Sequence, residues 1–375
     1  MQNEKQADTL KEDLGQASRI ALDCEAAGFH RYSDRLCLVQ ITTDSATYVL
    51  DALGFNVSPL LRPSLEHPDV QVNMHGSDFD LVLLGRDLGI RLSGLFDTQI
   101  AAALHGRESL GLASLLKDYH GIELSKKYQR ADWAMRPLTE GMLEYAAADT
   151  QYLNTLSDQM RTELRARGRE SWLVEECQAL EESSSSVQHS KEIDPVSRVK
   201  GARELTPRQL TALRQALQWR DKLARENDKA LFRIIGDGPL LEAVVMNPHS
   251  ARELFDIKGF PKGLARNKGS DLVRIFESVA RVPESELQSY PSRPRTRSRK
   301  SSLETEALLE ALKLVRNALA EKLGIAKGTL LSNAVLSRVA QTNPKDLSSL
   351  ADVEGMRGWK IEVVGDSLLE VIHRG

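Results

Sequence analysis

The chain has 375 residues, of which 41% are hydrophobic and 27% charged, and its formal net charge is −3. This length allows two or three domains with a large core, and no stretch approaches the ~20 consecutive apolar residues of a membrane helix. The three cysteines, Cys24, Cys37 and Cys177, are few and lack metal-type spacing, which argues against disulfides and structural zinc. The polar N-terminus has no signal-peptide core. These properties predict a cytoplasmic protein with buried thiols and no membrane attachment.

The first half of the chain mixes strand and helix patterns. Short runs rich in β-branched residues predict strands at residues 18–25, 36–43, 47–53 and 69–75. Helical periods follow at residues 77–89, 97–106, 110–121 and, as one long run, 139–168. This order predicts an α/β domain over residues 1–182, with a mixed sheet flanked by helices.

Two polar segments, residues 183–202 and 282–302, predict linkers. Both are rich in serine and the second also in proline and arginine, so neither can bury enough apolar surface to offset its ordering entropy. They separate two helical regions, residues 203–281 and 303–375.

The two helical regions are related to one another. Residues 96 positions apart match repeatedly, for example Arg220 with Arg316 and Gly259 with Gly355. A constant offset predicts two copies of one small all-α module.

Charge is distributed unevenly along the chain. Residues 196–302 hold 22 Lys+Arg and 12 Asp+Glu, a balance of +10, and the remaining 28 basic and 41 acidic residues give −13. The second linker contributes Arg293, Arg295, Arg297, Arg299 and Lys300. A basic segment beside an acidic one fits nucleic-acid binding next to a carboxylate-rich site. Chance partition of charge in a helical protein explains the same numbers.

The stretch "IALDCE" at residues 20–25 ends an apolar strand on two carboxylates. Side chains alternate along a strand, so Asp23 and Glu25 share one face. Two like charges this close repel one another, and burial strengthens the repulsion. Either the strand ends in solvent, or a cation neutralises the pair.

Two further acids each have a structural and a chemical interpretation. Asp80 begins a helix after a strand, where Ser77-x-x-Asp80 fits a capping box. Asp149 lies four residues after Tyr145, so the two share a helix face, either as a solvated acid and a half-buried tyrosine or as parts of one site. If all four acids meet, their pKa values rise unless cations neutralise them. Two Mg²⁺ or Mn²⁺ ions about 3.5–4 Å apart suit phosphodiester hydrolysis.

Three segments in order, "ALDCE", "HGSDFDL" and "YAAAD", resemble the motifs of the ribonuclease D family of DEDD-type 3′–5′ exonucleases. Asp23 and Glu25 match the first motif, Asp80 the second because it directly precedes a leucine, and Tyr145 and Asp149 the third. The helical repeats resemble HRDC modules, which bind nucleic acid. The resemblance implies a ribonuclease H-like α/β exonuclease domain followed by two small all-α HRDC-like domains.

The resemblance also implies a role for each motif residue. Asp23, Glu25, Asp80 and Asp149 would hold two divalent metal ions, Mg²⁺ or Mn²⁺. Tyr145 would orient the attacking water, since a phenol with an ordinary pKa near 10 is a poor base at neutral pH. The implied activity is 3′–5′ trimming of RNA 3′ ends, such as those of tRNA precursors, with release of nucleoside 5′-monophosphates.

Polar residues near these motifs are candidates for substrate contact, and each also fits a structural role. The candidates are Gln40, Thr42, His75, Lys127, Arg130 and Arg136. The first two alternate on a strand, His75 ends one, and the last three lie on the loop before the Tyr145 helix, where phosphate contact is expected. Asp97, in contrast, is interpreted as a helix cap.

Two other functions stay open at this point. A DNA 3′–5′ exonuclease would use the same site, because selection of the sugar depends on pocket shape. A non-catalytic RNA-binding protein is the second alternative, although the presence of all four acids and the tyrosine counts against it. The second helical module lacks the basic character of the first, so it is either an RNA binder or a structural spacer. No motif specifies a protein partner.

Overall fold

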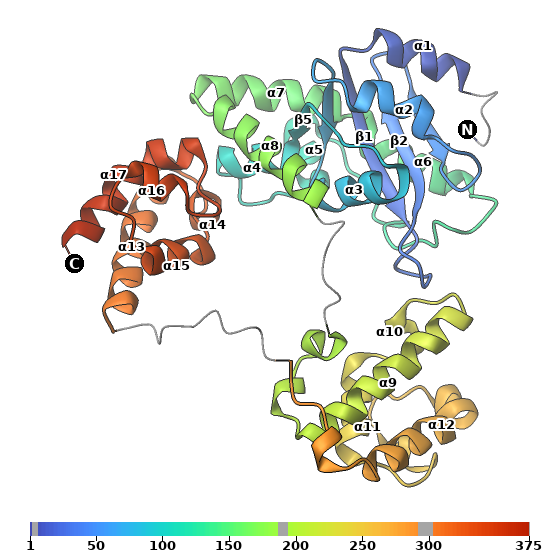
Figure 1. The fold of residues 1–375 in the computed structure, drawn as a ribbon. Coiled ribbons are helices and arrows are strands. Elements are labelled where there is room, and N and C mark those ends of the chain that lie inside the picture. Colours follow the sequence, from blue (N-terminus) through green and yellow to red (C-terminus); the bar gives the residue numbers. More distant parts are fainter. Residues whose placement is uncertain (2–6, 187–193, 292–302, 375) are drawn as a thin grey trace.

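A computed structural model of the chain describes residue 1 and residues 7–186, 194–291 and 303–374 (Figure 1). The N-terminal domain is built on a five-stranded sheet in the order β3-β2-β1-β4-β5. The strands are β1 (Arg19–Ala26), β2 (Leu36–Thr42), β3 (Thr47–Asp51), β4 (Gln71–Met74) and β5 (Leu95–Asp97). β1 pairs antiparallel with β2 and parallel with β4, so the sheet is mixed, as predicted.

The four predicted strands are all present, and β5 is an additional one. The sequence pattern does not predict β5, because a strand of three residues is too short to show an alternating apolar and polar pattern. Asp97 ends this strand and also caps the following helix, as predicted: its carboxylate accepts hydrogen bonds from the backbone N–H groups of Gln99 and Ile100.

Helices cover both faces of the sheet, since every residue of β2 is buried. They are α1 (Asp8–Gln16), α2 (Ser58–Leu65), α3 (Asp78–Leu83) with the π-helical turn η2 (Leu84–Leu88), α4 (Thr98–His105), α5 (Leu112–His120), α6 (Glu140–Gln151), α7 (Leu153–Ala166) and α8 (Glu170–Ser186). No helix in the described ranges is both long and apolar enough to cross a bilayer.

The long helix predicted over residues 139–168 is divided at Tyr152. α6 packs on β1, β2 and β3, whereas α7 packs on β1, β4 and α4. Because a sheet twists from strand to strand, one straight helix cannot follow both halves of it. The break therefore lets each helix follow its own strands, and it fixes α6 over the end of β1.

The two helical modules have the same plan. The first contains α9 (Pro207–Glu226), α10 (Leu231–Ile234), α11 (Asp237–Met246) and α12 (Lys262–Ala280). The second contains α13 (Leu303–Leu323), α14 (Lys327–Leu330), α15 (Asn333–Thr342), α16 (Leu347–Ala351) and α17 (Gly358–Arg374). Helices α9, α10, α11 and α12 each begin 96 residues before α13, α14, α15 and α17, which confirms the repeat.

Equivalent residues of the modules make equivalent contacts. Arg220 and Arg316 are both buried, and each donates a hydrogen bond to a backbone carbonyl, that of Ile235 or that of Leu331. These carbonyls are also 96 residues apart, so the repeat extends to its buried polar contacts. The five basic residues of the second linker, Arg293, Arg295, Arg297, Arg299 and Lys300, lie outside the described residues.

The modules differ in how they relate to the N-terminal domain. The apolar core of the second module is continuous with the core of the N-terminal domain, whereas the first module has a core of its own. In the second module, Trp359 stacks on Trp172 of α8, with ring centroids 4.4 Å apart. The backbone N–H of Trp359 donates to the Glu175 carboxylate at 3.1 Å, and its indole N–H donates to Glu176 at 2.9 Å.

Candidate active site

Three carboxylates meet where β1 ends. Asp23 and Glu25 point to the same face of β1, and α6 crosses that face and brings Asp149 to it. One oxygen from each of these three residues lies within 4.8 Å of the other two. The strand "IALDCE" therefore ends on two acids that face a third from a distant helix.

Asp80 lies outside this cluster of three oxygens but faces the same site. It is only 8% exposed, and its carboxylate accepts a hydrogen bond from the backbone N–H of Cys24, between the two acids of β1. The alternative capping box is absent, because Ser77 makes no side-chain cap and its hydroxyl donates to Asp97 at 2.8 Å. The structure thus favours the chemical interpretation of Asp80.

Burial raises the pKa of all four acids, and their mutual repulsion raises that of Asp23 and Glu25 further. The pKa of Glu25 rises to about 9, that of Asp80 to about 7 and that of Asp149 to about 6. The pKa of Asp23 also lies well above its usual range, first through burial and then through the charge of Asp80. Such a set of oxygen donors fits hard divalent cations, which would neutralise the charge and displace the protons.

Tyr145 stands beside these acids on α6. Its hydroxyl donates a hydrogen bond to Asp149, and burial together with the charges of Asp149 and Glu25 raises its pKa above the ordinary range. Its ring packs against Tyr128 and Trp133, with centroids 6.3 and 6.0 Å away. This raised pKa favours a phenol that orients a water molecule over one that acts as a base.

The burial of two of the predicted substrate contacts, Gln40 and Thr42, argues against their touching RNA. Gln40 is 0% exposed and Thr42 is buried, because α6 covers this face of β2. The Thr42 hydroxyl is hydrogen-bonded to Thr47 and to Thr150 of α6. Gln40 lies opposite Asp23 in the β1–β2 ladder, which favours a supporting place beneath the acids over contact with a ribose or base.

The contacts of Arg136 likewise favour a structural role over a phosphate contact. Its guanidinium forms two hydrogen bonds to Asp51, at 2.5 and 2.6 Å, and donates to the carbonyl of Trp133. All three of its nitrogens are thus engaged, and the arginine ties the loop before α6 to the end of β3.

The other three candidates stay predictions. His75 is partly buried, shares a hydrogen bond of 2.9 Å with Thr98 and has a pKa lowered by burial, so its ring is neutral. Lys127 and Arg130 are exposed on the loop before α6, where Lys127 lies over the ring of Tyr128 and Arg130 over that of Phe29.

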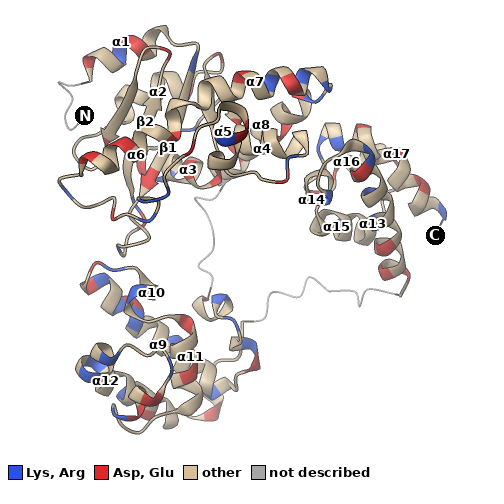
Figure 2. Cartoon of the chain, turned by 180° about the vertical axis from the view of Figure 1, so that it is seen from behind, with Lys and Arg blue, Asp and Glu red and all other residues tan. Residues whose placement is uncertain are grey.

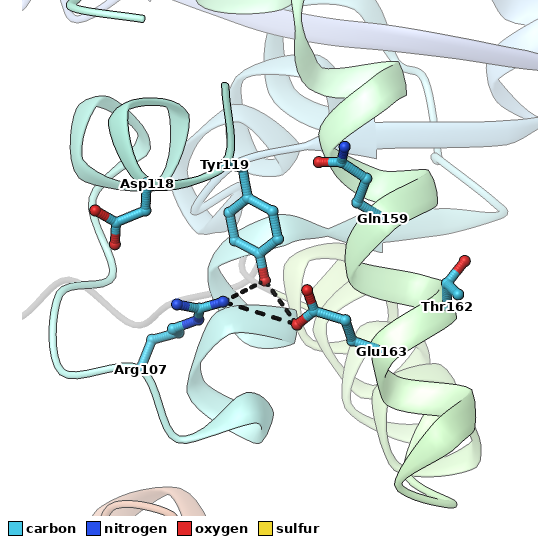
Figure 3. A pocket seen from close by; sticks show the side chains of 6 residues that line it. All are labelled: Arg107, Asp118, Tyr119, Gln159, Thr162 and Glu163. Atoms are coloured by element: carbon cyan, nitrogen blue, oxygen red, sulfur yellow. Dashed lines mark hydrogen bonds and ion pairs between the residues drawn. The ribbon is translucent and has the colours of Figure 1, made fainter. Parts of the chain in front are cut away.

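A separate surface pocket of about 480 Å³ lies between α5 and α7 (Figure 3). Arg107 donates to the Tyr119 hydroxyl at 2.9 Å, and that hydroxyl donates to Glu163 at 3.0 Å. Glu163 lies on α7, beyond the break at Tyr152 that separates this helix from α6 and Asp149. Arg107, Tyr119 and Glu163 satisfy one another, and none of the four acids lines this pocket, so it is not part of the acid site.

Known protein families and relatives match this chain in both its catalytic domain and its helical modules. A family model described as 3′-5′ exonuclease matches residues 1–165, and one described as HRDC domain matches residues 209–276 and 305–372. A ribonuclease D of Nitrobacter hamburgensis is 26% identical over 359 residues, which cover 94% of this chain and 90% of that protein. The chain belongs to the ribonuclease D family.

Solved structures and more distant relatives extend this assignment. The structure of Escherichia coli RNase D, described as an exoribonuclease involved in structured RNA processing, has a TM-score of 0.71, is 26% identical and covers 100% of this chain and 98% of its own. A protein from Bifidobacterium adolescentis reaches a TM-score of 0.83 with 26% identity, over 100% of this chain and 96% of its own. Exosome complex component 10 of Rattus norvegicus is 33% identical over 73% of this chain, but the match spans only 32% of that protein. As a member of the ribonuclease D family, the chain is a 3′–5′ exoribonuclease.

Proposed function

We propose that Asp23, Glu25, Asp80 and Asp149 bind two divalent cations, Mg²⁺ or Mn²⁺, and that the enzyme removes nucleoside 5′-monophosphates from RNA 3′ ends. The observation that supports this most strongly is the convergence of the four acids, three of them with oxygens within 4.8 Å of one another. In the absence of metal, desolvation raises the pKa of each of the four carboxyls above its ordinary value, that of Glu25 to about 9.

Each residue then has a defined task. Bound divalent cations supply a more acidic water and stabilise charge on the leaving oxygen. The four carboxylates fix the positions of the cations. The strand and helices that carry these carboxylates keep their oxygen atoms in place. Tyr145 donates to Asp149 and orients the attacking water through its oxygen. The ring of Tyr128 and the buried ring of Trp133 limit how far the Tyr145 ring can move.

We propose tRNA precursors and other structured RNAs with single-stranded 3′ ends as substrates. The Escherichia coli relative is described as acting in structured RNA processing, and Lys and Arg residues are spread along α9 and α12 of the first module, with one more on α10 (Figure 2). We further propose a catalytic domain at residues 1–182, modules at 203–281 and 303–375, and a cytoplasmic location. All three cysteines are buried, in keeping with that location.

A single experiment tests this function. A 3′-extended tRNA and a DNA oligonucleotide of matched 3′ sequence, both 5′-labelled, are incubated with the enzyme in Mg²⁺ and then in EDTA. Stepwise shortening of the RNA in Mg²⁺ alone supports the proposal. Equal or faster shortening of the DNA would instead make the protein a DNA exonuclease, and no shortening of either would leave a binding protein.

Replacing Tyr145 by phenylalanine is expected to lower kcat by about 10²-fold with little change in KM, because a positioned group contributes about 10²–10⁴-fold. The ring, and with it the packing against Tyr128 and Trp133, is retained. Turnover on a short RNA oligonucleotide is the measurement. A variant within twofold of the unmodified enzyme would reduce Tyr145 to a packing residue.

Mg²⁺ is expected to raise the melting temperature more at about pH 8 than at about pH 6. The pKa values of the four acids are higher in the folded state than in the unfolded state. Between about pH 4 and the folded-state pKa values, the folded chain therefore binds more protons than the unfolded one. The metal-free protein thus loses stability as the pH rises through this range. A bound cation takes the place of these protons, so it binds more tightly at the higher pH, where more of the carboxyls are already deprotonated. Melting curves with Mg²⁺ and with EDTA at both pH values measure the difference. An equal Mg²⁺ effect at both would contradict the assignment of the acids as ligands.

A further inference from the structure

An aromatic and basic cluster lies where the first module meets the catalytic domain. The loop between β1 and β2 carries Phe29, the loop before α6 carries Arg130, and α10 carries Phe232 and Arg233. The tip of the β1–β2 hairpin reaches α10 (Figure 1). Here the backbone N–H of Ala230 donates to the carbonyl of His30, and Arg233 donates to the carbonyl of Phe29 at 2.7 Å.

The rings of this cluster are exposed although they touch one another. Phe29 and Phe232 have centroids 5.4 Å apart, yet Phe29 is 38% and Phe232 53% exposed. The guanidinium of Arg130 lies 5.5 Å from the Phe29 centroid, and that of Arg233 lies 5.0 Å from it and 5.7 Å from the Phe232 centroid. The surface thus presents one open ring and two arginines held over aromatic faces.

The charges of these two arginines are not neutralised. Elsewhere in the junction, Arg31 pairs with Asp132 and Asp228, and Arg225 pairs with Asp221. Within the described ranges no carboxylate forms an ion pair with Arg130 or Arg233. The junction therefore holds two cations without a carboxylate partner among the described residues, beside exposed aromatic rings.

The cluster lies next to the acids. Phe29 follows Glu25 by four residues, which span at most about 14 Å of extended chain. Arg130 lies on the loop that also carries Tyr128, whose ring contacts that of Tyr145. An RNA strand that places its 3′-terminal phosphodiester at the acids has this cluster within reach of its next nucleotides.

We propose that Phe29, Phe232, Arg130 and Arg233 form a platform, built from both domains, that binds the single-stranded RNA upstream of the 3′-terminal nucleotide. Phe232 stacks on a base, Arg130 and Arg233 contact phosphates, and Phe29 holds both guanidinium groups in place. Aromatic faces with flanking cations are how proteins hold single strands without reading their sequence. This inference rests on the proposed function, since it assumes that the 3′ end enters the acid site.

The first test compares substrate lengths. In Phe232→Leu the ratio of KM for a ten-nucleotide RNA to KM for a dinucleotide is expected to rise about tenfold, because one stacked base contributes that much affinity or more. Phe255→Leu removes another exposed ring of the first module and is expected to leave the ratio unchanged. A ratio in Phe232→Leu equal to that of this control overturns the proposal, whatever happens to the melting temperature.

The second test does not depend on catalysis. Binding of the ten-nucleotide RNA in EDTA is followed by fluorescence anisotropy at several salt concentrations. Arg130→Gln is expected to lower the salt slope by about 0.7, the value for one phosphate contact on a single strand, whereas Arg130→Lys keeps it. Arg91→Gln, an exposed arginine before β5, controls for net charge. An unchanged slope in Arg130→Gln overturns the phosphate contact. If acid-site variants retained activity while these binding effects persisted, the proposed function would fail and the platform would stand.

Discussion

Asp23→Asn is expected to abolish RNA cleavage while leaving RNA binding largely intact. The substitution removes one negative charge from the point where the oxygens of Asp23, Glu25 and Asp149 converge. A bound cation supplies several kcal/mol of charge stabilisation, so its loss lowers kcat by roughly 10³-fold or more. Rates of 3′ trimming under saturating Mg²⁺, together with RNA binding in EDTA, measure the two effects separately.

The other acids sharpen this prediction. Glu25→Gln and Asp149→Asn should behave like Asp23→Asn, and full activity in any of the three would sink the two-cation assignment. Asp80→Asn separates the two interpretations of that residue, since a lost cap costs only about 0.5–2 kcal/mol of stability and no activity. Asp118→Asn, an exposed acid of the separate pocket, is the matched control and should cleave RNA normally.

The acid site is predictable from sequence because its signals are local. Alternation along a strand puts Asp23 and Glu25 on one face, and the four-residue spacing on a helix puts Tyr145 beside Asp149. The contact between these segments joins residues far apart in the chain. From sequence it can be predicted only from the order and spacing of the three motifs. In the folded chain it is the packing of α6 across the end of β1, the central strand, that brings these segments together.

The substrate contacts are less predictable, for the opposite reason. Strand alternation places Gln40 and Thr42 on one face of their own strand, but it does not say that α6 covers that face. Likewise, a loop arginine looks free for phosphate until its partner is known, and the partner of Arg136, Asp51, lies 85 residues away. The Phe29–Phe232 cluster carries no motif at all, since its rings come from two domains.

The second module illustrates the same limit. Its sequence holds 9 Lys+Arg and 10 Asp+Glu over residues 303–375, which leaves its role open. In the structure, Lys360 lies 2.6 Å and Arg357 3.9 Å from Glu176 of α8. Basic groups at the start of α17 are thus engaged by the catalytic domain. This favours the structural spacer over the RNA binder.

Trp359→Ala is therefore expected to destabilise the catalytic domain as well as its own module. Trp359 is almost fully buried, stacks on Trp172 and places its indole N–H on Glu176. Large-to-small changes of buried aromatic residues cost about 3–5 kcal/mol, and the lost hydrogen bond leaves a partly buried carboxylate without its donor. Urea unfolding is the measurement, with Leu314→Ala, an exposed leucine of α13, as the control expected to change little.

Removal of the whole second module is expected to act through the same contact. A chain ending before residue 303 exposes Trp172 and the apolar face of α8, which also packs on β5. Its catalytic domain should then unfold at lower urea than in the full chain, and RNA affinity should fall little, because the first module and its platform remain. If the truncated chain kept its full stability and lost RNA affinity instead, the second module would be an RNA binder and the Trp172–Trp359 stack incidental.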